Sequence, residues 1–123
     1  MSASKGDSKR GMEDNLKRAV TEMLVLNLLD QQDMYASQIM QSLEGGSKGT
    51  LTLVSPYMLF YRLIENGYIL EAYKKIADDG RRRQYYQITL EGRRYLADLI
   101  VVYRRVIGGV ELLLGGRGKT SEP

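Results

Sequence analysis

The 123-residue chain contains no cysteine, no histidine and no tryptophan. Without cysteine it can form no disulfide and no thiolate metal site, and without histidine it lacks the commonest general base of enzymes. An enzyme that used only carboxylates or lysine stays open, but no paired carboxylates form a recognisable motif. The sequence therefore favours a non-enzymatic protein that needs no cofactor and no metal.

Long apolar runs are absent as well. None of the apolar stretches approaches the roughly 20 residues that a membrane-spanning helix requires. Residues 1–15 are polar and do not contain the apolar core of a secretory signal peptide. We therefore expect a cytoplasmic protein with no membrane partner. A hydrophobic content of 43% in one short domain builds only a small core, which a partner chain would help to complete.

Positive charge is concentrated in one segment. The chain has 18 basic and 15 acidic residues, a formal net charge of +3. Residues 74–94 hold seven basic and three acidic residues, a balance of +4, so the rest of the chain sums to −1. Arg81, Arg82 and Arg83 follow the turn pair Asp79-Gly80, which predicts a basic hairpin tip. Such a tip would neutralise nucleic-acid phosphates, although most charge runs at turns are simply solvated.

Hydrophobic periodicity divides the chain into helices and strands. Apolar residues spaced by three and four predict helices over residues 13–30, 35–43 and 52–66. Alternating residues predict two strands over 68–76 and 83–88. Tyr86 and Ile88 would then face one side of the second strand, and Tyr85 and Gln87 the other.

The ends of the chain and its last helix complete the domain organisation. Thr89 is a helix cap for a long final helix. Residues 1–12 and 115–123 lack periodicity, so we expect a disordered arm and a flexible tail. The predicted fold is mainly α, of the α+β class: a winged helix-turn-helix with a two-stranded wing over residues 13–89, then a C-terminal dimerisation helix over residues 90–114.

The third helix carries the candidate DNA-reading surface. It begins either at Thr52 or at Ser55, with Pro56 in the first helical position, and the sequence leaves both starts open. With Leu59 and Leu63 inside, the outward residues are Ser55, Tyr57, Met58, Tyr61 and Arg62. Tyrosine hydroxyls can bind phosphates, and arginine can reach a phosphate or a guanine edge. Alternatively, Tyr57 would be half-buried under the wing and Arg62 paired with Glu65.

The last helix carries more large apolar side chains than the rest of so small a chain can cover. A homodimer accounts for them better than a single-chain core does. Two-fold symmetry would place two recognition helices about 34 Å apart and predicts a pseudo-palindromic operator. The expected interface comprises Leu16, Val20, Met23, Leu96, Leu99, Ile100, Tyr103, Val106, Ile107 and Val110.

Two segments resemble the PadR family of bacterial transcriptional regulators. Leu51 to Leu63 and the following Gly67-Tyr68-Ile69 are similar to that family's recognition helix, with Tyr57, Arg62-Leu63 and Gly67 at matching places. Arg82 to Thr89 with Gly92 is similar to its wing. The resemblance covers roughly residues 16–110. It implies a dimeric DNA-binding regulator of the repressor type, whose final helix packs on the partner's first helix and which answers to small aromatic or cationic compounds.

The chain also departs from the family pattern. Ala36 and Ser37 stand where a glycine-tyrosine pair is usual, Pro56 replaces an aliphatic residue, and the drug-stacking tryptophan of some relatives is missing. We therefore expect a homodimeric repressor that binds double-stranded DNA, with release by a small aromatic effector as a further option. The alternative is a winged-helix module that binds a ligand or protein and has lost specific DNA reading.

Overall fold

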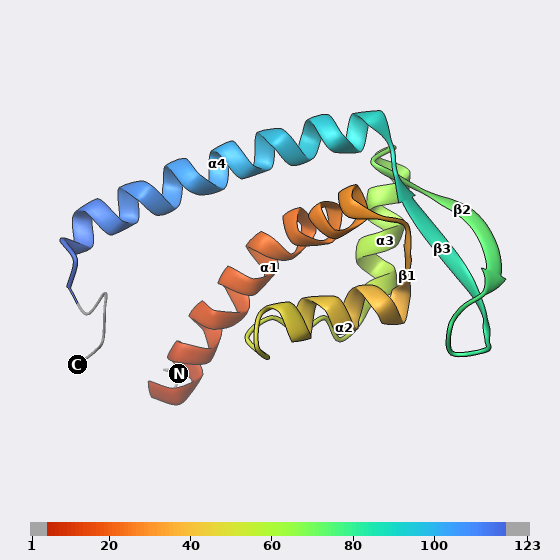
Figure 1. Ribbon diagram of the computed structural model, residues 1–123. Helices are drawn as coiled ribbons and strands as arrows, with labels where there is room; N and C mark the ends of the chain where they lie inside the picture. The colour runs from red at the N-terminus through yellow and green to blue at the C-terminus, as the bar shows by residue number, and fades with distance from the viewer. Residues whose placement is uncertain (1–4, 118–123) are drawn as a thin grey trace.

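The computed structural model describes the backbone of residues 5–117 and side chains from residue 9 onward. Figure 1 shows a helical molecule with a two-stranded ribbon projecting from one end. The described elements, in chain order, are α1 (Lys5–Gln31), β1 (Met34–Tyr35), α2 (Ala36–Gly46), α3 (Pro56–Glu65), β2 (Ile69–Ile76), β3 (Arg82–Ile88) and α4 (Leu90–Leu114). No helix within these residues is long and apolar enough to cross a membrane.

Helix α1 forms the centre of the core with its C-terminal half. Val25 and Leu26 are fully buried and Leu29 almost so, because α2, β3 and α4 surround this part of the helix. The helix begins at Lys5, whereas the sequence prediction placed residues 1–12 in a disordered arm and began the helix at Glu13. Residues 1–4 of that arm lie outside the described part. Residues 5–12 continue the backbone ladder of α1 without an apolar face, so periodicity gives no signal for them.

Helices α2 and α3 form the helix-turn-helix. Helix α2 continues through Gly45 and Gly46, the pair predicted to stop it, and ends at Ser47. Helix α3 begins at Pro56, with Ser55 as its N-cap. Of the two starts left open by the sequence, the structure selects the later one, because proline lacks an N–H and is favoured at the first helical position. The buried side of α3 comprises Pro56, Leu59, Phe60 and Leu63.

The sheet has three antiparallel strands in the order β1-β3-β2. Strands β2 and β3 form the predicted wing, with Ile69 opposite Ile88 at its base and Ile76 opposite Arg82 near its tip. Strand β1, which the sequence did not predict, pairs Met34 with Tyr86 and Tyr35 with Tyr85. The wing is therefore attached along its inner edge to the segment that starts α2.

A tight junction connects the wing to α4. Thr89 caps α4 by accepting a hydrogen bond from the Gly92 N–H at 3.0 Å, and its hydroxyl donates to the Gly67 carbonyl at 2.6 Å. A Cβ at Gly92 would lie 2.1 Å from the Tyr68 carbonyl oxygen. Only glycine fits this approach, so the glycine noted next to the wing in the sequence has a packing role.

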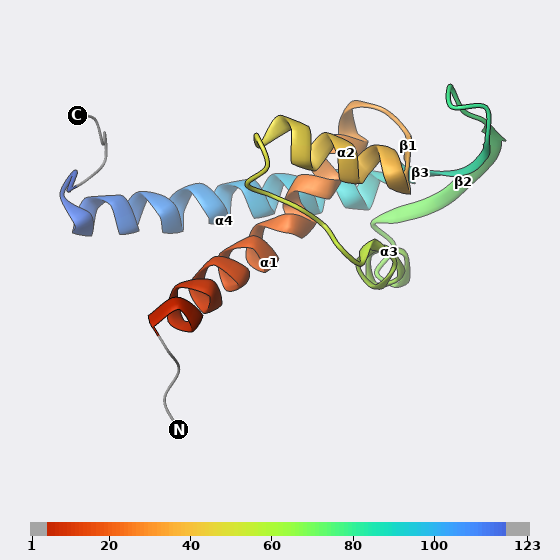
Figure 2. The same cartoon turned by 90° about the horizontal axis from the view of Figure 1, so that it is seen from below.

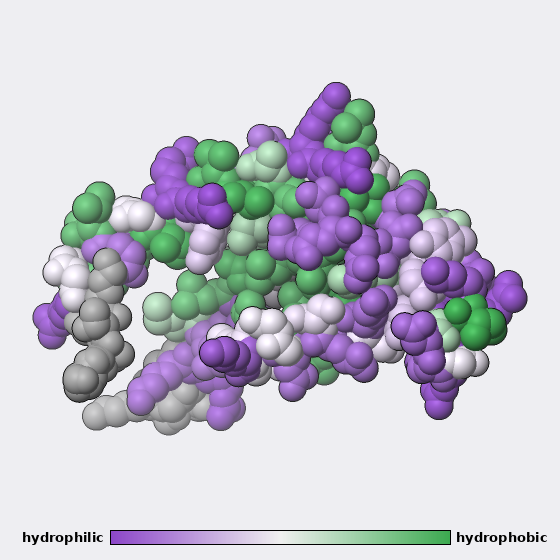
Figure 3. Space-filling model, in the orientation of Figure 1, coloured by the Kyte–Doolittle hydropathy of each residue, from purple (hydrophilic) through white to green (hydrophobic). Residues whose placement is uncertain are grey.

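Helix α4 extends well beyond the core. In Figures 1 and 2, α1 and α4 lie together near the wing and diverge toward their far ends. Figure 3 shows apolar residues along the length of α4. Beyond Ile100 most of its apolar side chains are exposed, including Val101 at 64% and Val106 at 53%. The helix continues through Gly108 and Gly109 to Leu114.

Candidate nucleic-acid interface

The first turns of α3 present an exposed aromatic and polar face. Tyr57 is 64% exposed, Met58 74% and Tyr61 63%, while the opposite side of the helix packs into the core. The Ser55 side chain makes no capping hydrogen bond. This division between faces matches the one predicted from the sequence. Hydroxyl groups on such a face can bind phosphates or base edges.

Arg62 lies in the last turn of α3, away from this face. Its guanidinium Nη2 lies 3.8 Å from Glu22 Oε2 of α1. The sequence placed Arg62 in the DNA-binding set and named Glu65 as the alternative partner. In the structure the carboxylate beside it is Glu22, which is 40 residues away along the chain and was not anticipated.

The tip of the wing displays the arginine run. Gly80 turns the chain with a φ of +82°, and the Ala77 N–H bonds to the Arg81 carbonyl at 2.9 Å. The side chains of Arg81 and Arg82 are exposed and have no ion pair with any described acidic residue. They are free to meet an external anion.

Arg83 differs from its two neighbours. Its guanidinium Nε donates to Asp79 Oδ2 at 3.2 Å and also lies 5.1 Å from the centre of the Tyr35 ring. The hydrogen bond from Arg83 lowers the pKa of the Asp79 carboxyl and raises the pKa of the Arg83 guanidinium. Arg83 is thus partly neutralised within the protein and helps to fix the wing against β1.

Aromatic stacking makes the wing stiff. The Tyr73 and Tyr85 rings stack with their centres 5.2 Å apart, and the Lys75 ammonium lies 4.8 Å from the Tyr85 ring centre. The Tyr73 hydroxyl donates to Asp33 at 2.7 Å, which raises the pKa of Tyr73. Tyr85 is therefore buried on the outer side of the wing, while Tyr86 packs on Phe60 in the core. The contributions of Asp33 and Lys75 were missed, because they depend on contacts between distant segments.

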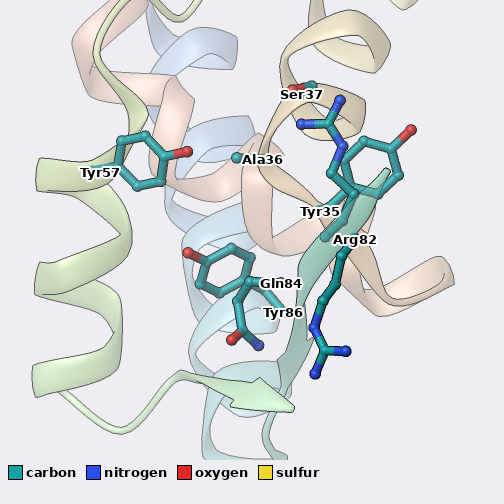
Figure 4. Close-up of a pocket in the computed structure, with 8 residues that line it drawn as sticks. Tyr35, Ala36, Ser37, Tyr57, Arg82, Gln84 and Tyr86 are labelled. Carbon is teal, nitrogen blue, oxygen red and sulfur yellow. The ribbon is translucent and has the colours of Figure 1, made fainter. Parts of the chain in front are cut away.

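A cleft of about 240 Å³ separates the wing from the helix-turn-helix. In Figure 4 the Tyr57 and Tyr86 hydroxyls point into the space between α3 and β3. The cleft joins Tyr57, Arg82 and Arg83, which the sequence had placed in one functional set. None of its lining residues is acidic; they are Tyr35, Ala36, Ser37, Tyr57, Arg82, Arg83, Gln84 and Tyr86. Ser37 and Gln84 were noted only as departures from a pattern, so their place in the cleft is new.

The residues predicted for a dimer interface separate into two groups. Leu96 and Met23 are buried in the core of the single chain, and Val20, Leu99 and Ile100 pack against that core. Ile107 is half-buried, and the remaining members are exposed: Leu16, Tyr103, Val106 and Val110. The inner half of the predicted set thus already has a partner within the chain, and the outer half has none among the described residues.

Comparisons with known proteins agree with this architecture. The profile of the family described as "Transcriptional regulator PadR-like family" matches residues 25–98, which include the helix-turn-helix, the wing and the start of α4. The crystal structure of a PadR family transcriptional regulator from Eggerthella lenta DSM 2243 is 26% identical, with a TM-score of 0.71, over 92% of this chain and 94% of that one.

Two further relatives have similar lengths. A PadR-like transcriptional regulator from Bacillus cereus strain ATCC 14579 is 25% identical, with a TM-score of 0.69, over 81% of this chain and 96% of that one. An uncharacterized protein X from Lysinibacillus sphaericus is 27% identical over 107 residues, 85% of this chain and 97% of the relative. The likeness therefore covers the helices and the wing together and is not confined to one motif.

Proposed function

The chain belongs to the PadR-like family of transcriptional regulators, and on that premise we propose that it is a homodimeric repressor that binds a pseudo-palindromic operator. Members of this family are DNA-binding regulators and not enzymes, as the absence of histidine and cysteine led us to expect. The winged-helix fold predicted from the sequence is confirmed, with β1 as an additional strand.

One observation supports the DNA-binding face above all. The exposed first turns of α3, the acid-free cleft and the unpaired arginines of the wing tip lie next to one another. We propose that α3 enters the major groove with Ser55, Tyr57, Met58 and Tyr61, because recognition helices read bases with their N-terminal residues. Arg81 and Arg82 would hold the flanking backbone, with a smaller contribution from the partly neutralised Arg83.

The homodimer rests on the unpartnered outer half of α4. Val101, Val106 and Val110 are all more than two-fifths exposed, and they recur at spacings of five and four residues along one region of the helix. Exposed large apolar side chains in such a row mark an interaction surface. A second copy of α4 and α1 would cover them. Occupation of a promoter by this dimer would exclude other proteins and so repress transcription.

The effector remains the finest part of the proposal. A cleft of about 210 Å³ lies between α1 and α4, lined by Met23, Leu24, Asn27, Ile100, Tyr103 and Arg104. It joins apolar walls with a few polar groups, as small-molecule sites do. A partner chain would deepen it. We propose that a small aromatic compound, if one regulates this protein, binds here.

A titration with the DNA upstream of the protein's own gene tests the proposal. Labelled upstream DNA should bind at nanomolar to sub-micromolar concentrations and show a two-fold symmetric footprint, whereas unrelated DNA should bind at least about 1,000-fold more weakly. Equal affinity for both would support the alternative, a winged-helix module that has lost specific DNA reading. Failure to bind either would refute the proposal.

A further inference from the structure

Glu22 connects three helices through one carboxylate. It lies in α1, and its side chain is only 18% exposed. One oxygen accepts a hydrogen bond from the Tyr95 hydroxyl of α4 at 3.0 Å. The other lies 3.8 Å from the Arg62 guanidinium of α3. Within the described residues, Glu22 is the acidic side chain that touches both the helix proposed to read DNA and the helix proposed to form the dimer.

Tyr95 is itself held in place. Its ring stacks on Tyr68, with ring centres 4.1 Å apart and planes 11° apart. Tyr68 follows α3 almost directly, and its carbonyl accepts the Thr89 N–H at the start of α4. Burial and the hydrogen bond to Glu22 raise the pKa of Tyr95 to about 12, so this hydroxyl remains a neutral donor at physiological pH.

Arg62 is the basic residue of α3, and it lies at the wrong end of the helix for base reading. Recognition helices contact bases mainly through their N-terminal residues, and Arg62 occupies the last turn. An ion pair between two exposed side chains stabilises little. Because Glu22 is mostly buried, its attraction to Arg62 is less screened than that of a surface pair.

We propose that Glu22 is a positioning residue that holds α3 in its DNA-reading orientation relative to α1 and α4, through Arg62 and Tyr95. The inference rests on the proposed function, because it presumes that α3 reads DNA. It assigns Arg62 a role within the protein and not at the base edges. Met23, the next residue of α1, lines the cleft against α4. Any displacement of α4 along α1 therefore reaches α3 through this carboxylate.

The Glu22→Gln variant separates positioning from simple electrostatics. Loss of one carboxylate changes the formal net charge from +3 to +4, which by itself favours DNA binding. We expect the opposite: operator affinity should fall about 3- to 30-fold, the range for residues that act through a network. Glu44→Gln in α2 is the matched control, because Glu44 is exposed and has no ion pair among the described residues. It should bind as tightly as wild type or slightly more so.

A double-mutant cycle tests whether Glu22 acts through Arg62. Arg62→Gln should weaken binding about as much as Glu22→Gln, and the double variant should be no weaker than either. None of the three should change the dependence of affinity on salt, because none loses a phosphate contact. Additive losses, a salt slope reduced by about one in Arg62→Gln, or tighter binding by Glu22→Gln would each overturn the proposal.

Hydrogen exchange in the free protein gives a readout that does not need DNA. In Glu22→Gln, and in Tyr95→Phe, which keeps the ring stack, the α3 amides should exchange faster than in wild type while the α2 amides stay unchanged. Unchanged exchange in α3 of both folded variants would refute the positioning role. Failure of the wild-type protein to bind DNA would instead refute the proposed function, so the two failures are distinguishable.

Discussion

Replacement of Arg81 and Arg82 by alanine should flatten the salt dependence of DNA binding. Each neutralised phosphate contributes about 0.9 to the slope of log affinity against log salt. Two arginines in each of two protomers would make four contacts, so the slope should decrease in magnitude by about 3.6. Over a rise from about 50 to about 200 mM salt, the ratio of the variant's Kd to the wild-type Kd should therefore shrink about 150-fold.

The assay is fluorescence anisotropy with labelled upstream DNA at several potassium chloride concentrations. Arg94→Ala with Arg105→Ala removes the same charge from α4 and should leave the slope unchanged, because the long-range field alone releases no bound counterion. A decrease of only about 1.8 would show that one protomer contacts DNA. An unchanged slope in the Arg81 and Arg82 variant would refute the phosphate-binding role of the wing tip.

Three further predictions follow from packing, exposure and charge. Val106→Glu places a charge on the exposed apolar row of α4, so sedimentation should show a monomer where the wild type is a dimer, and equal sedimentation would contradict the interface. Gly92→Ala forces a Cβ to within 2.1 Å of the Tyr68 carbonyl and should lower the free energy of unfolding by several kcal/mol, or about 3; Gly45→Ala in α2 meets nothing within 4 Å and should instead stabilise by about 1 kcal/mol. Because the pKa of Tyr95 is raised to about 12 in the folded state, the folded protein holds this proton more tightly than the unfolded chain, whose tyrosines ionise near 10, so the stability it contributes is complete below pH about 10 and is lost as pH rises toward 12; urea midpoints at pH 9 and 11 should differ less in Tyr95→Phe than in wild type, and an equal difference would contradict the assignment.

Much of the fold could be predicted from local signals. Periodicity located the helices and both strands of the wing, and Thr89 capped α4 as expected. Where two local signals competed at the start of α3, the conformational restriction of Pro56 decided the outcome. Gly45 and Gly46 misled the prediction, because their helical cost is small at the end of a helix that is already packed.

What could not be predicted depends on contacts between distant segments. Strand β1 has only two residues, and it forms because Tyr85 and Tyr86 of β3 offer a free edge. Glu22 looks like an ordinary polar residue of α1, since its partners Arg62 and Tyr95 are 40 and 73 residues away. Likewise, the arginine run reads as three equal charges, and only the fold shows that Asp79 and Tyr35 hold Arg83.

The direct join of β3 to α4 through Thr89 makes the long helix a lever. With no flexible linker between Ile88 and Leu90, the wing and the start of α4 turn together. A 25-residue helix is about 37 Å long, so in the proposed dimer a change of about 10° in its tilt moves one end by about 6 Å. That distance is nearly two base-pair steps of about 3.4 Å. A small change where two copies cross would thus alter which spacing of operator halves both wings can grip, so the protein could select its sites by their separation as well as by their bases.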